Sequence, residues 1–213
     1  MLDPGCHRFD VLGEGPTGAS ARHELDAELR GPDEGRLLVR DRTDSADARL
    51  EQCVGEATPA VVAISGSANA KVTILHHTWD LPEHLPKQWG AHFPARIGTL
   101  LHARKLTLGG GRAIATIRGV SGRTHLVQPI RHGSCYLSVV ASEGEPGRGL
   151  GLRAQVGGAD FADERGVLDQ AAAVTFCAGR HKQATFEVES RGSGSSWILM
   201  VIELVEGAWL FER

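Results

Sequence analysis

Four cysteines, Cys6, Cys53, Cys135 and Cys177, are the residues of this sequence whose spacing most clearly predicts chemistry. Cys6 and Cys53 are 47 residues apart, Cys135 and Cys177 are 42 residues apart, and each pair encloses one copy of a similar pattern. Four cysteines allow three disulfide connectivities. Because equivalent strands of two copies bring their cysteines together in the same way, the repeat favours the disulfides Cys6–Cys53 and Cys135–Cys177. The alternative is four free cysteines buried in a cytosolic protein. Zinc is disfavoured because no C-x-x-C spacing occurs.

The paired cysteines also predict a compartment. Disulfides persist outside the reducing cytosol, so we expect an extracytoplasmic protein that is periplasmic, secreted or part of the cell envelope. Copy two is preceded by 113–119 and 125–130, which are typical of strands, whereas copy one has only residues 1–5 at that place. We therefore expect a natural longer form to carry the missing first strand of copy one and an export signal upstream.

Aspartates gather at corresponding places in the two copies and could supply oxygen ligands for calcium, which takes six or more of them. Neither run matches an EF-hand loop, and aspartate is also common in turns because its side chain bonds to the nearby backbone. Calcium is the one cofactor that the sequence leaves open, and otherwise we expect none. The candidate ligands are Asp41, Asp44 and Asp47 in copy one and Asp160, Asp163 and Asp169 in copy two.

Histidines near the middle of the chain are the remaining candidates for metal binding. His76 and His77 end a predicted strand, where neighbouring side chains point to opposite faces, so the two rings cannot easily share one ion. With His84, His92 and His102 nearby, a surface zinc site and a metal-dependent hydrolase remain the rival hypothesis. The alternative is a set of exposed polar residues.

Other catalytic chemistry has little support. The chain has no G-x-S-x-G nucleophile motif, so its serines are interpreted as turn residues. The glycines of 147–151 lead into a strand pattern and not into a helix, so the helix N-terminus of a dinucleotide site is missing. We therefore expect no enzymatic activity.

Two tryptophans are the speculative ligand-binding residues. Trp79 and Trp89 flank a Pro-rich segment, and exposed aromatic rings can stack on sugars or fill a pocket of a partner. The alternative is that both rings pack under the neighbouring helix and over the sheet edges.

The elements that must position these residues are mostly short strands. Leu25, Ala27 and Leu29 alternate with polar residues, as a half-buried strand requires. Similar runs joined by turns recur through both copies and indicate antiparallel β-sandwiches. We predict an all-β fold of two tandem, jelly-roll-like sandwich domains joined by a Pro-rich linker with one short helix. The expected ranges are 1–78 for copy one, which lacks its first strand, 79–111 for the linker with a helix over about 95–106, and 112–213 for copy two.

Composition excludes several classes of partner. The formal charge of −3 and the scattered basic residues offer no basic stripe for nucleic acid. No run of about 18 apolar residues exists to form a transmembrane segment.

The segment 25–41 resembles the pre-peptidase C-terminal type of bacterial jelly-roll sandwich. It has a strand with an early aspartate, Asp26, then the turn Pro32-Asp33, then a strand that ends at Asp41. Copy two keeps the strand rhythm but lacks the early aspartate and the Pro-Asp turn. The resemblance implies a secreted, usually non-catalytic appendage of exported enzymes or surface proteins.

The expected function is therefore that of a non-catalytic extracytoplasmic binding or structural module. A carbohydrate-binding module is the alternative. We expect a protein or glycan partner at the inter-domain region, near Trp79, Trp89 and the helix.

Overall fold

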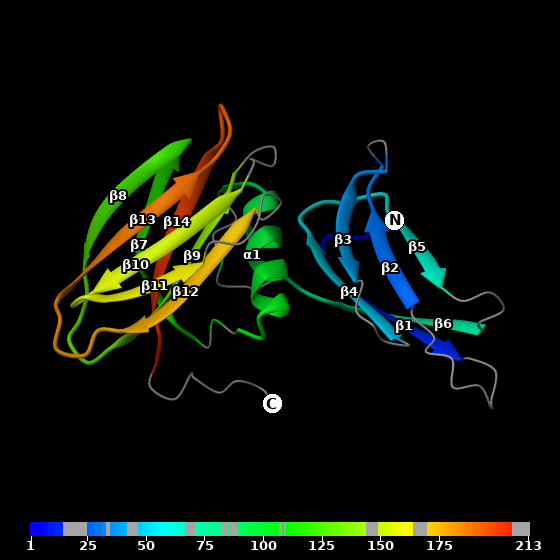
Figure 1. Cartoon of the computed structure of the whole chain (residues 1–213), viewed down its shortest axis with the longest axis horizontal. Coiled ribbons are helices and arrows are strands. Elements are labelled where there is room, and N and C mark those ends of the chain that lie inside the picture. Colours follow the sequence, from blue (N-terminus) through cyan, green and yellow to red (C-terminus); the bar gives the residue numbers. More distant parts are fainter. Residues whose placement is uncertain are drawn as a thin grey trace. The chain divides into compact units, whose positions relative to one another are not determined.

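The computed structural model divides the chain into two compact units, Met1–Leu81 (unit 1) and Pro82–Arg213 (unit 2). The structure describes residues 1–14, 25–32, 35–41, 47–66, 71–81, 85, 89–106, 108, 110–143, 149–163 and 170–205. Each unit contains two antiparallel sheets (Figure 1), which confirms the predicted all-β fold of tandem sandwiches. In the described ranges, no helix combines the length and apolar character that crossing a bilayer needs.

Unit 1 is a sandwich of two three-stranded sheets. One sheet has the order β4-β1-β6 and contains β1 (Gly5–Glu14), β4 (Asp47–Val54) and β6 (Lys71–Trp79). The other has the order β3-β2-β5 and contains β2 (Leu25–Arg30), β3 (Leu37–Asp41) and β5 (Val61–Gly66). The alternating apolar residues of β1, β2 and β4 meet between the sheets and form the core, which includes Val11, Leu29 and Leu50.

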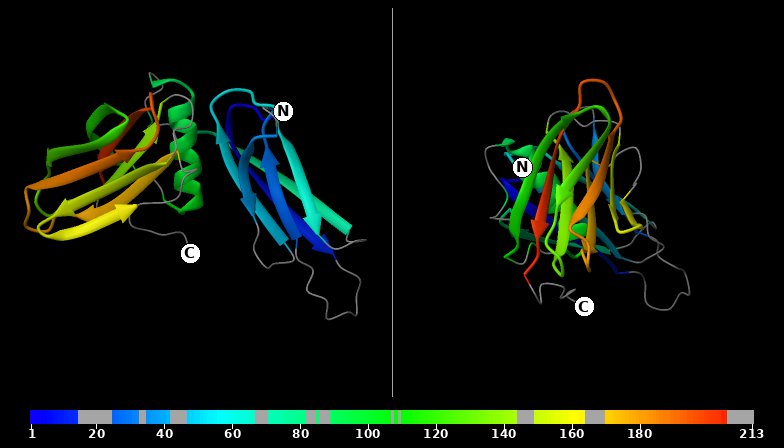
Figure 2. Two further views of the ribbon diagram at one scale, coloured as in Figure 1. Left: turned by 45° about the horizontal axis from the view of Figure 1, so that its top comes forward. Right: turned by 90° about the vertical axis from the view of Figure 1, so that its left-hand side faces the viewer.

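Unit 2 is a larger sandwich of two four-stranded sheets, shown from two sides in Figure 2. One sheet has the order β12-β9-β14-β7, and the other has the order β11-β10-β13-β8. The core between the sheets contains Trp197, Phe186 and Leu152, all fully buried. The strands are β7 (Arg112–Val120), β8 (Gly122–Pro129), β9 (Cys135–Ser142), β10 (Leu150–Val156), β11 (Ala159–Asp163), β12 (Ala171–Cys177), β13 (Gln183–Ser190) and β14 (Ser196–Glu203).

The helix α1 (His92–Ala103) covers the outer face of the β12-β9-β14-β7 sheet. It begins and ends three residues earlier than the expected 95–106. Pro94 still lies in the first turn, where a helix needs no backbone N–H from it. Phe93, Ile97 and Leu101 pack on the sheet because they recur on one face of the helix. The strands β9 and β14 are consequently buried on both faces.

An ion pair fixes the C-terminal end of α1 to the same sandwich. Arg104 Nη2 lies 2.5 Å from Asp163 Oδ2, and both side chains are largely buried. Arg104 also donates to the Ala173 carbonyl oxygen at 3.1 Å, while the Ala173 N–H donates to Asp163 at 2.8 Å.

The two units share a frame of six strands. In chain order β1 to β6 correspond to β9 to β14, and each set has the same order within its sheets. The strands β7 and β8 of unit 2, one in each sheet, have no counterpart in the described part of unit 1. The expectation that copy one lacks its first strand stays a prediction.

Both predicted disulfides are confirmed. Cys6 of β1 lies directly opposite Cys53 of β4, and Cys135 of β9 lies directly opposite Cys177 of β12. The Cα atoms are 3.9 Å apart in each pair. The two bridges therefore join equivalent strands at equivalent registers, as the repeat indicated.

Candidate functional site

Among the described strands of unit 1, β5 and β6 are each the last strand of a sheet and have a partner on one side alone. In unit 2 the equivalent strands β13 and β14 are not edges, because β8 pairs with β13 and β7 pairs with β14. We call the corresponding region of unit 1 the open side. It consists of the outer edges of β5 and β6 with the inward-facing side chains of Val62, Ile64, Val72, Ile74 and His76.

The registers of the ladders allow a comparison residue by residue. Val72, Ile74 and His76 pair with the strand β1 at the positions that Trp197, Leu199 and Val201 occupy against β9. Val72 is 38% exposed and Ile74 is 47% exposed, whereas the three counterparts in unit 2 are fully buried. The residues of the open side thus occupy positions that belong to the core in unit 2. No described strand of unit 1 pairs beside them as β7 pairs with β14.

The neighbouring strand shows the same partial exposure. Val62 and Ile64 pair with the buried Leu29 and Ala27 of β2, yet both remain only half-buried. Strand edges present backbone N–H and C=O groups that can pair with another chain. The outer edges of β5 and β6 border the apolar interior between the two sheets. Such an arrangement suits the binding of a polypeptide that adds a strand to a sheet.

A pair of histidines lies beside the open side. The His76 ring stacks on Phe9, with ring centroids 4.3 Å apart and nearly parallel planes. His76 Nε2 lies 3.0 Å from His7 Nδ1, and His7 Nε2 lies 2.7 Å from the Asp3 carbonyl oxygen. Because a carbonyl oxygen only accepts, His7 Nε2 carries its proton, and His7 Nδ1 accepts from His76.

This environment disfavours the protonated form of His76. Burial lowers the pKa of His76 from its ordinary value, and electrostatic repulsion from the neighbouring His7 and His77 lowers it further. The sequence analysis did not identify His7, because it lies 69 residues from its partner and only the β1–β6 pairing joins them. The pair is well placed to make the open side sensitive to acid.

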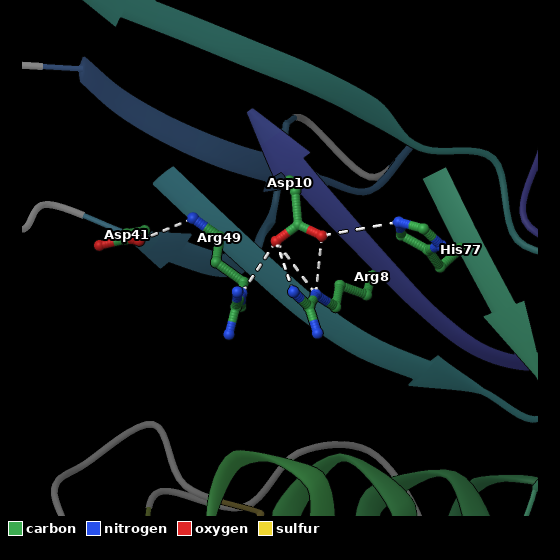
Figure 3. Close-up of polar contacts among 5 residues, drawn as sticks. All are labelled: Arg8, Asp10, Asp41, Arg49 and His77. Atoms are coloured by element: carbon green, nitrogen blue, oxygen red, sulfur yellow. Dashed lines mark hydrogen bonds and ion pairs between the residues drawn. The ribbon is translucent and has the colours of Figure 1, made fainter. Parts of the chain in front are cut away.

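The outer face of the β4-β1-β6 sheet has a different character (Figure 3). Asp10 accepts hydrogen bonds from Arg8 Nε at 3.0 Å and from Arg49 Nε at 2.9 Å, and His77 Nε2 lies 3.7 Å away. The Arg49 backbone N–H donates to Asp41 at 2.8 Å. Burial raises the pKa of Asp10, but hydrogen bonds and charge from the two arginines outweigh it, so the pKa lies below its usual value.

Equivalent positions in unit 2 are apolar. Arg8, Asp10 and Arg49 occupy the places of Leu137, Val139 and Ala173, which α1 covers. The charged cluster therefore stands where unit 2 packs its helix. Its members satisfy one another, and none is paired with a nucleophile, so the cluster is best explained as a polar face of unit 1.

The four described aspartates among the calcium candidates already have contacts. Asp41 accepts from Arg49, Asp47 accepts from the Gly13 N–H at 3.2 Å, and Asp160 lies 3.5 Å from Arg153. Asp163 is paired with Arg104 as described above. Among the described residues, no three carboxylates bring their oxygens within ligand distance of one another. Asp44 and Asp169 lie outside the described residues, and calcium binding stays a prediction.

The histidine and tryptophan candidates are dispersed. His76 faces the interior of unit 1 and His77 faces Asp10 on the outer side, in accordance with the expectation that they cannot share an ion. His92 and His102 belong to α1 of unit 2, and His84 lies outside the described residues.

The two tryptophans belong to different units. Trp79 ends β6 opposite Cys6 and is half-buried. Trp89 packs edge-on against Phe93, with ring centroids 5.1 Å apart, as part of the layer between α1 and its sheet. Trp89 thus has the structural packing that was the alternative to ligand binding.

Comparisons with known proteins do not identify a family. No family model matches the chain, and no curated protein matches it. Among solved structures, similarity reaches the infectious bursal disease virus VP2 subviral particle with a TM-score of 0.30 and 10% identity, over 96% of this chain and 57% of that chain. The secreted serine protease VesC from Vibrio cholerae gives 0.29 and 10%, over 95% and 48%.

A third solved structure, a family GH115 4-O-methyl-α-glucuronidase, gives a TM-score of 0.27 and 14% identity over 48% of this chain. The present chain corresponds to only 17% of that enzyme's length and to about half of the other two proteins. Similarities this weak carry no argument about function.

Proposed function

We propose that this chain is a non-catalytic, extracytoplasmic binding module and that the open side of unit 1 binds a polypeptide segment. The observation that carries the proposal is the exposure of Val72 and Ile74. Their counterparts Trp197 and Leu199 are fully buried in unit 2, where β7 pairs with their strand. Burying apolar area of this kind is the main favourable term in protein association.

A second contrast supports the proposal. At the positions that correspond to those packed against α1 in unit 2, unit 1 has the charged residues Arg8, Asp10 and Arg49. Where unit 1 lacks β7 and β8, valine and isoleucine remain. A surface that always faces water would be expected to become polar in both places, so the open side is suited to being covered.

The extracytoplasmic part of the proposal rests on the two disulfides, since such bonds persist in oxidising compartments. The resemblance of 25–41 to pre-peptidase C-terminal sandwiches is in keeping with it and stays a hypothesis. Fractionation of the native host, with the mass of the protein measured without reductant, tests this part. Four free thiols in exported protein would contradict it.

The binding part is tested by selecting peptides from a displayed random library against the full chain. We expect selected peptides to lose at least tenfold in affinity on Val72→Lys, which places a charge in the open side. Val127→Lys is the matched control, because Val127 is an exposed valine of β8 in unit 2. Peptides that bind both variants equally would contradict a binding site at the open side.

Glycan recognition is the rival outcome. It would show as glycan-array binding that is lost on Trp79→Ala and retained on Val72→Lys. Trp89 packs edge-on against Phe93 and is half-buried, and its part in glycan recognition stays a prediction.

A further inference from the structure

We infer that one end of unit 2 binds an acidic polysaccharide through basic side chains on two neighbouring turns. This site is separate from the open side and goes beyond the proposed function. The residues are Arg131, His132, Arg180 and Lys182, and we call them the basic end. They belong to the connections β8–β9 and β12–β13, which lie at the same end of unit 2 in Figure 1.

Hydrogen bonds join the two turns into one surface. The Gly133 N–H donates to the Gly179 carbonyl oxygen at 2.8 Å, and the Ala178 N–H donates to the Ser134 carbonyl oxygen at 2.8 Å. The basic residues of the two turns are far apart in the sequence and come together only through these contacts. For this reason the sequence shows scattered basic residues and no stripe.

Internal contacts fix both turns in the absence of a ligand. The hydroxyl group of the buried Tyr136 accepts a hydrogen bond from the Arg131 backbone N–H at 2.6 Å. In the other turn, the His181 N–H donates to the Ala178 carbonyl oxygen at 2.9 Å. The His181 ring lies against Gly157, where an added Cβ atom would overlap the ring. A surface that is ordered in advance loses less conformational entropy when a ligand binds.

The basic end carries more positive charge than nearby acids neutralise. The two turns contain no aspartate or glutamate. Arg131 Nη1 lies 3.6 Å from Glu203 Oε1, and Arg112 Nη2 lies 3.4 Å from Glu203 Oε2. One carboxylate therefore serves two guanidinium groups. Arg180 and Lys182 are exposed, and neither forms an ion pair with a described residue.

Other arginines of unit 2 are paired with acids on the strands. Arg123 lies 3.5 Å from Glu187 and 3.5 Å from Glu189, and Arg191 Nε lies 3.1 Å from Glu189. Because those charges are largely neutralised, they attract a distant anion only weakly. Cations without acidic partners raise the local concentration of anions, which favours the basic end as the point of capture.

The side chains of the two turns favour a polysaccharide over other polyanions. Every residue of both turns is described, and none is an exposed tryptophan, tyrosine, phenylalanine or large aliphatic residue. Single-stranded nucleic acids need aromatic rings on which bases stack, and membrane surfaces need apolar side chains that insert. The basic end offers cations and hydrogen-bond donors, which suit carboxylate or sulfate groups along a hydrated polymer.

The test measures binding of the full chain to dextran sulfate and to polygalacturonate by calorimetry, with uncharged dextran as the control polymer. We expect binding to at least one acidic polymer and none to dextran. Binding should weaken at least tenfold between about 50 mM and about 500 mM NaCl, because salt screens exposed charges. If one acidic polymer alone binds, its sulfate or carboxylate is the group that the site recognises.

Two double variants with equal loss of charge locate the site. Arg180→Gln with Lys182→Gln should weaken binding at least tenfold, because it removes both cations without an acidic partner. Arg123→Gln with Arg191→Gln is the matched control and should weaken binding less than twofold, because both arginines are paired with Glu189. Trp79→Ala should leave binding unchanged, which separates this site from glycan recognition through that ring. The melting temperature of each variant checks that it folds.

Several results would overturn the inference. Equal losses in the two double variants would show that net charge alone explains binding. Absence of binding to both acidic polymers at the lower salt concentration, or equal binding to dextran, would remove the site. Tighter binding to phosphatidylglycerol vesicles or to single-stranded DNA would assign another class of partner. None of these results bears on the open side, which Val72→Lys tests.

Discussion

Units 1 and 2 have the same six-strand frame and the same cross-strand disulfide, but unit 2 adds three covering elements. These are α1 on one outer face and β7 and β8 along one side of the sandwich. The residues beneath α1 are apolar in unit 2 and charged at the equivalent places in unit 1. The inward-facing residues of β14, the strand that pairs with β7, are apolar in unit 2. The equivalent residues of β6 in unit 1 are still largely apolar.

The two corresponding surfaces of unit 1 therefore differ in character among the described residues, one being charged and the other apolar. A surface with Asp10 held by Arg8 and Arg49 is compatible with water at all times. A surface with Val72 at 38% and Ile74 at 47% exposure gains free energy whenever a partner removes it from water.

Removal of one disulfide at a time should have the largest effect. The double variant Cys6→Ala and Cys53→Ala should lower the free energy of unfolding of unit 1 by about 4 kcal/mol, and Cys135→Ala with Cys177→Ala should do the same for unit 2. Unit 1 should be the one that unfolds near room temperature, because its sandwich has fewer strands. Scanning calorimetry measures both transitions. A unit 1 that melts unchanged would show that the bridge does not limit its stability.

Truncation of the side chain at one equivalent position in each unit tests how far burial differs between the two units. Leu199→Ala should destabilise unit 2 by about 3 kcal/mol, because Leu199 is fully buried. Ile74→Ala should destabilise unit 1 by less than about 1 kcal/mol, because Ile74 is half-exposed. Urea unfolding of each variant gives the two values. Equal costs would indicate that the open side is already covered in solution.

The ionic contacts of the two units should also differ. Arg104→Ala should cost about 3 kcal/mol, because it leaves the buried Asp163 carboxylate without its charged partner. Arg8→Ala should cost less than about 1 kcal/mol, since Arg8 is partly exposed and Asp10 keeps Arg49. The same unfolding measurements apply, and the ranking of the two variants decides whether burial sets these energies.

Acid should act on unit 1 through His76. Because the folded pKa of His76 lies below its ordinary value of 6.5, the unfolded chain binds this proton first as the pH falls. The contribution of His76 to stability is therefore complete above about pH 6.5 and decreases below it. His76→Val, which copies Val201, should flatten the melting temperature of unit 1 between about pH 7 and pH 5.

The control for the acid experiment is His125→Gln in unit 2, whose side chain is mostly exposed. It should leave the pH dependence of unit 1 unchanged. A steep dependence that survives in His76→Val would assign the effect to another group. Asp10 cannot supply it in this range, because its lowered pKa places the loss of its contribution below its ordinary value of 3.8.

Much of the fold was predictable from the sequence because the strand patterns are local. The alternation of Leu25, Ala27 and Leu29 predicted a strand that the structure shows as β2, and the cysteine pairing followed from the repeat. The strand β11 has no comparable signal in the sequence, because it is a short and polar run that follows Gly157 and Gly158. The helix was placed three residues late because Pro94 was assigned to its start.

The candidate site was less accessible from the sequence. Val72 and Ile74 have an ordinary strand pattern, and nothing local shows that their cover is absent. Their exposure is visible only when the registers of two ladders are compared. The alternation of Arg8 and Asp10 on β1, against Leu137 and Val139 on β9, is the one signal in the aligned copies that could have shown the change of outer face.

The place of the first disulfide has a mechanical consequence. Cys6–Cys53 joins β1 to β4, at the edge of the sheet farthest from β6. A tensile force on the chain can strip β6 from β1 by breaking hydrogen bonds alone, but it then meets a covalent bond. The residues from Cys6 to Cys53 cannot lengthen under that load until the bridge is reduced. We therefore expect the strand Lys71–Trp79 to detach first under force. The disulfide then limits how far the chain of unit 1 can extend.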